Sequence, residues 1–490
     1  MTETSNKEEP VEVEKVSLLN EPNNSNRFKK LEVNFACMCI FVFLHGIEFA
    51  VILPTLWDRL HLDFNASGTF MGLVLSSYML MCVICGFIMG PISDRVERTK
   101  IFYVVGIICT IIGEFLYFMG INKYVILASK LISGVVGGAD PVGYAYIAKT
   151  TTKKRRLTII GILMASRQLG LMFGPAFNLF LRKTNFMLFG FPVNRLSSPG
   201  LFMAILWIVF LIIIAIFYHD NPKYNFRIRK TAEETNFTLR DYINEFMRFE
   251  MFVLLLITFF THFNQTSLET IVIPFTEIMY GWNELQNSIL FCIAGATIII
   301  SFGFIFLLES KLKLKEKIIL LTGLVLIITG LTIACTCLPF AKQLQDHSKD
   351  HQVFNNDTQI NSNDTTTIIG PTSRNLNKTY DYQFFPAFII FVLLDVIGLT
   401  AISITSSSIF SKLTRNKMQG SGQAIQRGIL GFGTIFGPLC AGPFVQKPIY
   451  LLACTLFFIL IIFVLYLFSF KLINIESNET VKSSDDNDDD

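Results

Sequence analysis

The chain is built of long apolar runs of about twenty residues, separated by short polar loops. An apolar run of about 18 residues or more is long enough to cross a bilayer as an α-helix. The runs therefore predict an all-α integral membrane protein with twelve transmembrane helices in two pseudo-symmetric six-helix bundles. The expected helices span residues 33–53, 70–89, 101–120, 124–148, 157–181 and 199–218 in the first bundle, and 251–273, 288–308, 318–338, 384–410, 420–444 and 449–470 in the second.

The composition agrees with a membrane protein. Of the 490 residues, 52% are hydrophobic and 16% are charged, whereas soluble domains carry about 25% charged residues. The first thirty residues are polar and acidic, so we expect no cleaved signal peptide and an uncleaved signal in the first helix. The ten cysteines lie in or at the ends of apolar runs, which predicts neither a disulfide framework nor a metal site.

Lysine and arginine gather in alternate loops. The basic loops lie around residues 95–100, 153–156, 311–315 and 412–417, and the loops between them are poor in basic residues. Basic loops face the cytosol, so both termini are expected there. Glycosylation sequons fall in the opposite loops, at Asn65, Asn356, Asn363 and Asn377. The expected parts are a cytosolic N-terminus (1–32), the first bundle (33–218), a linker (219–248), the second bundle (249–470, with a glycosylated loop at 339–383) and an acidic tail (471–490).

Two of the expected helices repeat the pattern Gly-x-x-x-Gly-Pro at corresponding places. Two glycines one turn apart leave one helix face without side chains, so a neighbouring helix can approach closely. The proline then bends the helix end. The repeat predicts two related halves, which a transporter that rocks between two states requires. The gating residues expected from it are Gly170, Gly174, Pro175, Gly433, Gly437 and Pro438.

The segment GPISDRVERTK, residues 90–100, is a short charged loop between two expected helices. Its glycine and proline are expected to end the preceding helix. The pattern Gly-x-x-x-Asp-Arg-x-x-Arg-x-Lys resembles the loop after the second helix of major facilitator superfamily transporters. The resemblance implies the fold of that superfamily and a gating role for Gly90, Asp94, Arg95 and Arg98. It also implies that Asp94 sits at the N-terminus of the eleventh helix and bridges to an arginine. Glu97 departs from the pattern, because the family usually has glycine there.

A second stretch, ETIVIPFTEIMYGW at residues 269–282, is similar to the lysosomal domain-containing protein 8 group of that superfamily. The helix from Gly170 to Pro175, the pair Ser411-Lys412 and the pair Gln419-Gly420 also fit this group. The similarity covers most of the membrane region and fades at the termini, the linker and the 339–383 loop. It implies an endolysosomal transporter or channel-like protein without a cofactor, with chloride or other small anions as the expected solutes.

Two arginines lie about halfway along expected helices of opposite halves. Arginine stays charged at any working pH and can hold carboxylate, phosphate or other anions. Ionisable groups at membrane depth are costly and usually face a cavity, so Arg167 and Arg427 predict an anionic substrate. The alternative is structural ion pairs, of Arg167 with Asp140 and of Arg427 with Asp395. The expected substrate-binding residues are Arg167, Gln168, Arg427 and Lys130; the lysine lies near a helix end and could instead reach the membrane surface.

A histidine beside a carboxylate titrates near the pH of an acidic organelle. His45 and Glu48 are therefore the first candidates for proton coupling, and the alternative is that His45 is a hydrogen-bonded packing residue. The complete set of candidates for proton coupling is His45, Glu48, Asp140, Glu269 and Asp395.

The segment from Glu14 to Leu18 and Leu19, EKVSLL, fits an acidic dileucine sorting signal. The expected partners are the lipid bilayer, clathrin adaptors bound through this signal, and a small-molecule or anion substrate, with no nucleic acid. Three functions remain open: a secondary transporter or uniporter of a small anion in the lysosome, a channel-like anion conductance on the same fold, and a polytopic membrane enzyme or scaffold. The duplicated halves favour transport, and the third function has no reaction signature to support it.

Overall fold

The computed structural model describes residues 24–95, 98–151, 153–188, 190–220, 244–310, 314–357, 384–414 and 419–470. The dileucine signal with Glu14, Leu18 and Leu19, the sequons at Asn363 and Asn377, and Glu97 lie outside these residues. Helices dominate the described part, because nearly every apolar run satisfies its backbone hydrogen bonds within its own helix, as a bilayer requires.

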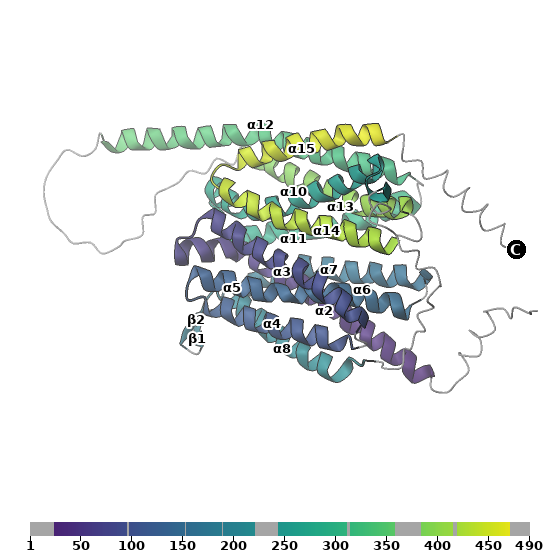
Figure 1. The fold of residues 1–490 in the computed structure, drawn as a ribbon. Coiled ribbons are helices and arrows are strands. Elements are labelled where there is room, and N and C mark those ends of the chain that lie inside the picture. Colours follow the sequence, from purple (N-terminus) through teal and green to yellow (C-terminus); the bar gives the residue numbers. More distant parts are fainter. Residues whose placement is uncertain are drawn as a thin grey trace, which may run out of the picture.

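The first half of the chain forms one helix bundle (Figure 1). A short antiparallel hairpin, which the sequence did not predict, joins its last two helices. The helices are α2 (Asn24–Phe64), α3 (Gly68–Arg95), α4 (Lys100–Met119), α5 (Lys123–Ser133), the 3₁₀ turn η1 (Gly134–Gly138), α6 (Ala139–Thr150), α7 (Lys153–Leu181) and α8 (Ser198–Phe217), and the hairpin strands are β1 (Phe186–Leu188) and β2 (Phe191–Val193).

The second half forms a second bundle beside the first (Figure 1). Its elements are α10 (Phe249–Tyr280), α11 (Glu284–Ser310), α12 (Glu316–Asp357), α13 (Phe385–Leu413), α14 (Gln419–Ala441), the 3₁₀ turn η3 (Gly442–Phe444) and α15 (Pro448–Ser469). We call the end of the molecule where α2 begins and α15 ends the near end. The opposite end, with the α2–α3 and α10–α11 turns, is the far end.

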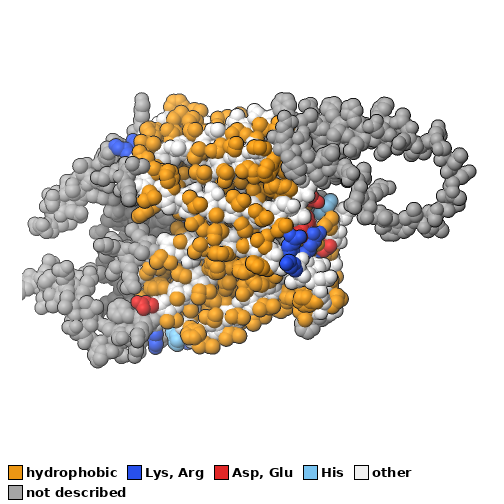
Figure 2. Space-filling model, turned by 180° about the vertical axis from the view of Figure 1, so that it is seen from behind, with side chains coloured by type: hydrophobic (Ala, Val, Ile, Leu, Met, Phe, Trp, Pro, Cys, Tyr) orange, Lys and Arg blue, Asp and Glu red, His pale blue; other side chains and the backbone are white. Residues whose placement is uncertain are grey.

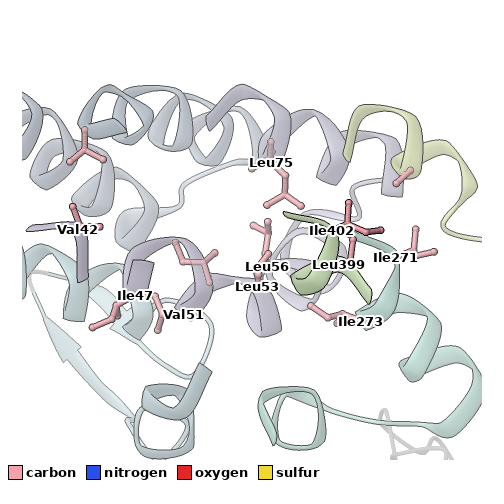
Figure 3. Close-up of a cluster of buried hydrophobic side chains, with 14 of the residues drawn as sticks. Val42, Ile47, Val51, Leu53, Leu56, Leu75, Ile271, Ile273, Leu399 and Ile402 are labelled. Carbon is pink, nitrogen blue, oxygen red and sulfur yellow. The ribbon is translucent and has the colours of Figure 1, made fainter. Parts of the chain in front are cut away.

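The two bundles meet along two pairs of helices. α3 of the first bundle packs against α14 of the second, and α7 packs against α11. One apolar cluster continues across this boundary: it includes Val42, Ile47, Val51, Leu53 and Leu56 of α2 together with Ile271 and Ile273 of α10 and Leu399 and Ile402 of α13 (Figure 3). The boundary between the halves is therefore packed with side chains from both.

Hydrophobic side chains cover the lateral surface of the described molecule (Figure 2). Charged side chains visible on this face gather at its two ends. A surface of this kind is stable only when its sides are covered by hydrocarbon, because exposed apolar area of this extent would otherwise drive aggregation. The distribution agrees with the predicted membrane protein.

Eleven helices of the described part are long and apolar enough to cross a membrane. They correspond to all the predicted spans except the eleventh. That segment is present as the 23-residue helix α14, but its first part, QGSGQAIQRG, consists mostly of polar residues and glycine. α14 packs between α10 and α3, so its neighbours are largely protein, and a less apolar sequence is sufficient there.

Several predicted helix ends were wrong. α3 continues through Gly90 and Pro91 to Arg95, so glycine and proline do not end it. α2 likewise continues past Pro54 to Phe64. α12 extends to Asp357, within the predicted irregular loop (Figure 1). In a long helix, hydrogen bonds of the flanking turns outweigh the one donor that a proline lacks.

Candidate substrate-transport site

The fourth predicted span is not one continuous helix. The sequence GVVGG forms the 3₁₀ turn η1 between α5 and α6, where α3 comes too close for larger residues. A Cβ on Gly137 would lie 2.5 Å from Sγ of Cys82, and one on Gly138 would lie 2.5 Å from Cβ of Cys85. The break places Asp140 in the first turn of α6, where a helix N-terminus favours a negative charge.

Asp140 gathers the charged side chains of the first half. Its Oδ2 lies 3.3 Å from Nδ1 of His45 and 3.7 Å from Nη1 of Arg167. One turn along the same helix, the ring of Tyr144 lies 4.0 Å from the guanidinium carbon of Arg427, a cation–π contact. Both arginines therefore contact α6 where the halves meet. Arg167 contacts the carboxylate of Asp140, and Arg427 contacts the aromatic face of Tyr144.

The two arginines lie equally far along their helices from the far end. Arg167 is as far along the chain from Leu181, the last residue of α7, as Arg427 is from Ala441, the last residue of α14. With a rise of about 1.5 Å per residue, each lies about 21 Å from the far end of its helix. The Arg167 side chain is 44% exposed. Because Arg427 contacts a residue of the other half, it points to the boundary between the halves and not to lipid.

The sequence suggested three pairs of charged side chains. The structure contains one of them, and in the other two the residues have different partners. Arg167 pairs with Asp140, as the structural alternative predicted. The suggestion that Arg427 pairs with Asp395 was wrong. Oδ1 of Asp395 instead accepts a hydrogen bond from Nδ2 of Asn264 at 2.8 Å. His45 contacts Asp140 and not Glu48, whose carboxylate accepts a hydrogen bond from Nε1 of Trp207 at 3.1 Å.

Lys130 is paired inside the first bundle and does not reach the membrane surface. Its ammonium is buried and donates to Oε1 of Glu114 at 2.6 Å, and the ring centroid of Tyr117 lies 4.8 Å away. A buried charge paired this closely is neutralised by its partner. The geometry gives Lys130 a structural role in the first bundle and no position from which to contact a solute between the halves.

A cavity of about 310 Å³ opens between the two halves on the side of α10, α11 and α13. α2, α7 and α15 complete its wall, and Gln168 lines it from α7. Two carboxyl groups also line it, Glu269 and Asp395. Nε2 of Gln265 donates to Oε1 of Glu269 at 3.0 Å, so each of these two acids has a neutral amide as its hydrogen-bond donor.

The glycine repeat packs as predicted in both halves. A Cβ on Gly174 would lie 2.7 Å from Cβ of Ala50, and one on Gly170 would overlap the carbonyl of Phe43, so α7 lies directly on α2. In the second half, a Cβ on Gly433 would lie 2.6 Å from the carbonyl oxygen of Phe259, and α14 lies directly on α10 in the same manner. Equivalent helix pairs are therefore in close contact in the two bundles.

Contacts between the halves close the far end. Nη1 of Arg195, in the turn before α8, donates to both carboxylate oxygens of Glu284 at 3.1 and 2.9 Å. Nε1 of Trp57 donates to Glu277, and Gly72 of α3 lies against Pro438 of α14. The space between the halves is thus closed here, at the end opposite the start of α2.

The remaining expected residues have the following places. Asn65 is exposed in the α2–α3 turn with a φ of +47°, and Asn356 belongs to the last turn of α12. Asp94 and Arg95 form the end of α3, but their side chains lie outside the described part, as does the expected bridge of Asp94. Arg98 is exposed in the following turn.

Sequence reasoning missed Tyr144, Trp207 and the far-end contacts. Tyr144 could have been found, because it lies one turn after Asp140 and so shares its helix face. Trp207 lies in an apolar helix without any polar neighbour in sequence, so only the fold shows that its indole reaches Glu48. The Arg195–Glu284 pair joins residues 89 apart, and nothing in either local sequence points to the other.

Two six-helix bundles with a polar cluster and a cavity between them define a membrane transporter and not an enzyme. Residues 38–343 match the Major Facilitator Superfamily, and the chain belongs to this family.

Relatives and solved structures agree with this assignment. The chain is 27% identical over 306 residues to major facilitator superfamily domain-containing protein 8 of Xenopus laevis, covering 59% of each protein. It is 28% identical over 185 residues to multidrug resistance protein 1 of Bacillus subtilis, covering 37% of the chain and 46% of the relative. These matches span less than two thirds of the relatives' length.

Two solved structures have a similar fold. The nucleoside transporter NupG matches with a TM-score of 0.61 and 14% identity, covering 90% of this chain and 98% of that one. A bacterial homologue of the human lysosomal transporter Spinster, in an inward-facing and unoccupied conformation, matches with a TM-score of 0.59 and 15% identity, covering 89% and 96%. Likeness at these identities shows the fold, which is that of secondary transporters.

Proposed function

We propose that this protein moves an anionic solute across the endolysosomal membrane by alternating access, with Arg167, Arg427 and Gln168 as the binding groups. One observation carries the proposal: α6 holds an arginine from each half, at the boundary between the halves. The cluster has two guanidinium groups and one carboxylate, Asp140, so it carries excess positive charge for an anion to neutralise.

A solute that binds both halves at once can be exposed to one side of the membrane and then to the other when the halves move relative to each other. When the far end is closed by the Arg195–Glu284 pair, a solute at the arginines can leave only toward the near end. Rocking of the halves about the α3–α14 and α7–α11 contacts would reverse this. The close helix pairs built on Gly170 and Gly433 keep each half rigid during the movement, because their backbones are in direct contact.

Protons can be coupled to the anion through Asp140. An anion that binds Arg167 competes with Asp140 for the guanidinium, and the displaced carboxylate is then neutralised by a proton on the adjacent His45, whose Nδ1 is 3.3 Å away. Glu48 lies one turn from His45 on α2 and is completely buried, so it is placed to pass a proton onward. Glu269 and Asp395 are the corresponding candidates in the second half.

The endolysosomal location rests on signals in the sequence. The basic loops support cytosolic termini, and the sequon residues Asn65 and Asn356 both lie at the far end, which would then be the lumenal side. The dileucine signal supports adaptor-mediated sorting. Replacing Leu18 and Leu19 with alanine should move the protein to the cell surface, and unchanged lysosomal staining would exclude the signal.

The binding site is tested in proteoliposomes that contain the purified full-length protein. Arg167→Ala and Arg427→Ala should each abolish chloride and sulfate flux. The control Arg182→Ala, at an exposed arginine in the turn directly after α7, should leave the flux unchanged. Normal flux in both site variants would exclude the anion site. Flux that accumulates solute against its gradient when a pH gradient is applied supports the transporter, and a conductance insensitive to the pH gradient supports the channel-like alternative.

A further inference from the structure

The cavity beside the arginines is much larger than a small ion needs. Its volume of about 310 Å³ lies at the lower limit of sites that hold drug-sized organic molecules. Its wall consists mainly of large apolar side chains, including Phe291, Phe388 and Phe391. Apolar walls attract no hydrated inorganic ion, since they offer it nothing in exchange for its water shell.

The cavity begins beside Arg167, although neither arginine belongs to its wall. Gln168 lines the cavity and is the neighbour of Arg167 in α7. On α2, Phe49 lines the cavity one turn after His45, which contacts the same carboxylate, Asp140, as Arg167. A solute with its anionic group at Arg167 would therefore extend its remaining atoms into the cavity.

The opposite part of the cavity is acidic. Glu269 lies on α10 about three turns before the far end of that helix at Tyr280, and Asp395 lies on α13 about three turns after its start at Phe385. At about 1.5 Å per residue, both lie about 16 Å from the far end, roughly 5 Å nearer to it than the arginines. A second negative charge on the solute would thus meet two carboxyl groups, which repel it whenever they are ionised, and strongly so in an apolar environment.

We infer that the solute is an organic monoanion with a sizeable apolar body: its charged group binds at Arg167 and Arg427, and its body fills the cavity between α10, α11 and α13. This inference rests on the proposed anion site and names the class of substrate for it. The site favours such a molecule over an inorganic anion through apolar burial. It also rejects a dianion of the same shape through Glu269 and Asp395.

The inference is tested with three permanently charged probes on the full-length protein in nanodiscs. Naphthalene-2-sulfonate carries one charge and an apolar body, naphthalene-2,6-disulfonate carries a charge at each end of the same body, and sulfate has no apolar body. Fluorescence titration and competition should give naphthalene-2-sulfonate at least roughly ten-fold tighter binding than either other probe, from burial of its rings. Binding of all three probes within two-fold of one another would overturn the inference.

Two matched pairs of variants separate the cavity from the anion site. Ala294→Phe fills the cavity, whereas Ile293→Phe changes the neighbouring residue of α11, which is 50% exposed and does not line the cavity. Val392→Phe and Ile390→Phe form the same pair on α13, where Ile390 is 49% exposed. The filling variants should weaken naphthalene-2-sulfonate binding at least roughly ten-fold and keep sulfate binding, and the controls should change neither.

The outcomes distinguish the two proposals. If Arg167→Ala weakens both naphthalene-2-sulfonate and sulfate while both filling variants bind naphthalene-2-sulfonate normally, the anion site stands and the inference is wrong. If Arg167→Ala and Arg427→Ala weaken neither probe, the proposed anion site is wrong and the inference fails with it. Retained sulfate binding in a filling variant also proves that the variant is folded.

Discussion

The ion pair that closes the far end makes a quantitative prediction about conformational balance. Glu284 of the second half is buried, with 4% of its side chain exposed, and Arg195 of the first half is 42% exposed. Arg195 lies in a turn, so Arg195→Gln removes one charge of the pair without disturbing a helix. It leaves the carboxylate of Glu284 facing the boundary without its cation in the closed state.

The magnitude follows from this burial. Leaving a buried acceptor unsatisfied costs about 1–3 kcal/mol, and the exposure of Arg195 to solvent places the pair toward the lower part of that range. A destabilisation of about 1–2 kcal/mol changes an equilibrium roughly 5- to 30-fold. When the far end opens, solvent reaches Glu284 and the cost disappears, so the substitution shifts the population toward the far-open state by that factor.

Single-molecule fluorescence transfer measures this shift directly. Dyes on non-natural residues at Asn65 and Asn283, which are exposed in turns of opposite halves at the far end, report the separation of the halves. Arg195→Gln should raise the low-transfer population. The double variant Arg195→Glu with Glu284→Arg, which exchanges the two charges, should return this population to the level of the unmodified protein. The exposed Arg182→Gln is the control and should have no effect. Equal populations in Arg195→Gln and the unmodified protein would refute the assignment of this pair as a closing contact.

Three further predictions concern the bundles and the arginines. Lys130→Met should lower the free energy of unfolding by about 3 kcal/mol, because it leaves Glu114 buried and unpaired, and the double variant with Glu114→Gln should recover much of the loss in a thermal unfolding assay. Gly437→Val should abolish solute flux or expression, because the added atoms collide with Thr266 of α10, whereas Gly161→Ala, which meets nothing within 4 Å, should be tolerated. Tyr144→Leu should weaken anion binding several-fold by releasing the Arg427 guanidinium, and Tyr144→Phe, which keeps the aromatic face, should retain most of it in the same titration.

The features that the sequence predicted correctly are those set by local pattern. Apolar run length determines which segments become membrane helices, and the Gly-x-x-x-Gly-Pro repeat was sufficient to predict that α7 and α14 each pack closely on a neighbour. Arg167 could be paired with Asp140 because ionisable residues are so few in the spans that the possible partners are limited. Each of these predictions needed only spacing within a helix or a count of rare residues.

The predictions that failed depend on which helices become neighbours. Arg427 contacts Tyr144 and not Asp395, because α14 of the second half packs across the boundary on the first half. His45 contacts Asp140 because the break at Gly134–Gly138 places this aspartate in the first turn of a new helix, α6, facing α2. Predicted helix ends failed at Pro54 and Pro91, where the flanking turns continue the helix past the proline.

The two halves are equivalent in packing and different in chemistry. The first half provides most of the charged groups, and the second half provides most of the apolar cavity wall. Equivalent helix pairs, α7 on α2 and α14 on α10, make each bundle a rigid body, as movement about a central boundary requires. The charged groups are not equivalent: His45, Asp140, Glu114 and Lys130 belong to the first half, whereas the second half provides most of the apolar cavity wall. Because Arg427 is the second half's contribution to a cluster otherwise built by the first, an anion that binds both arginines links the two rigid bodies. Solute binding is thereby connected to their relative position, which neither half could achieve alone.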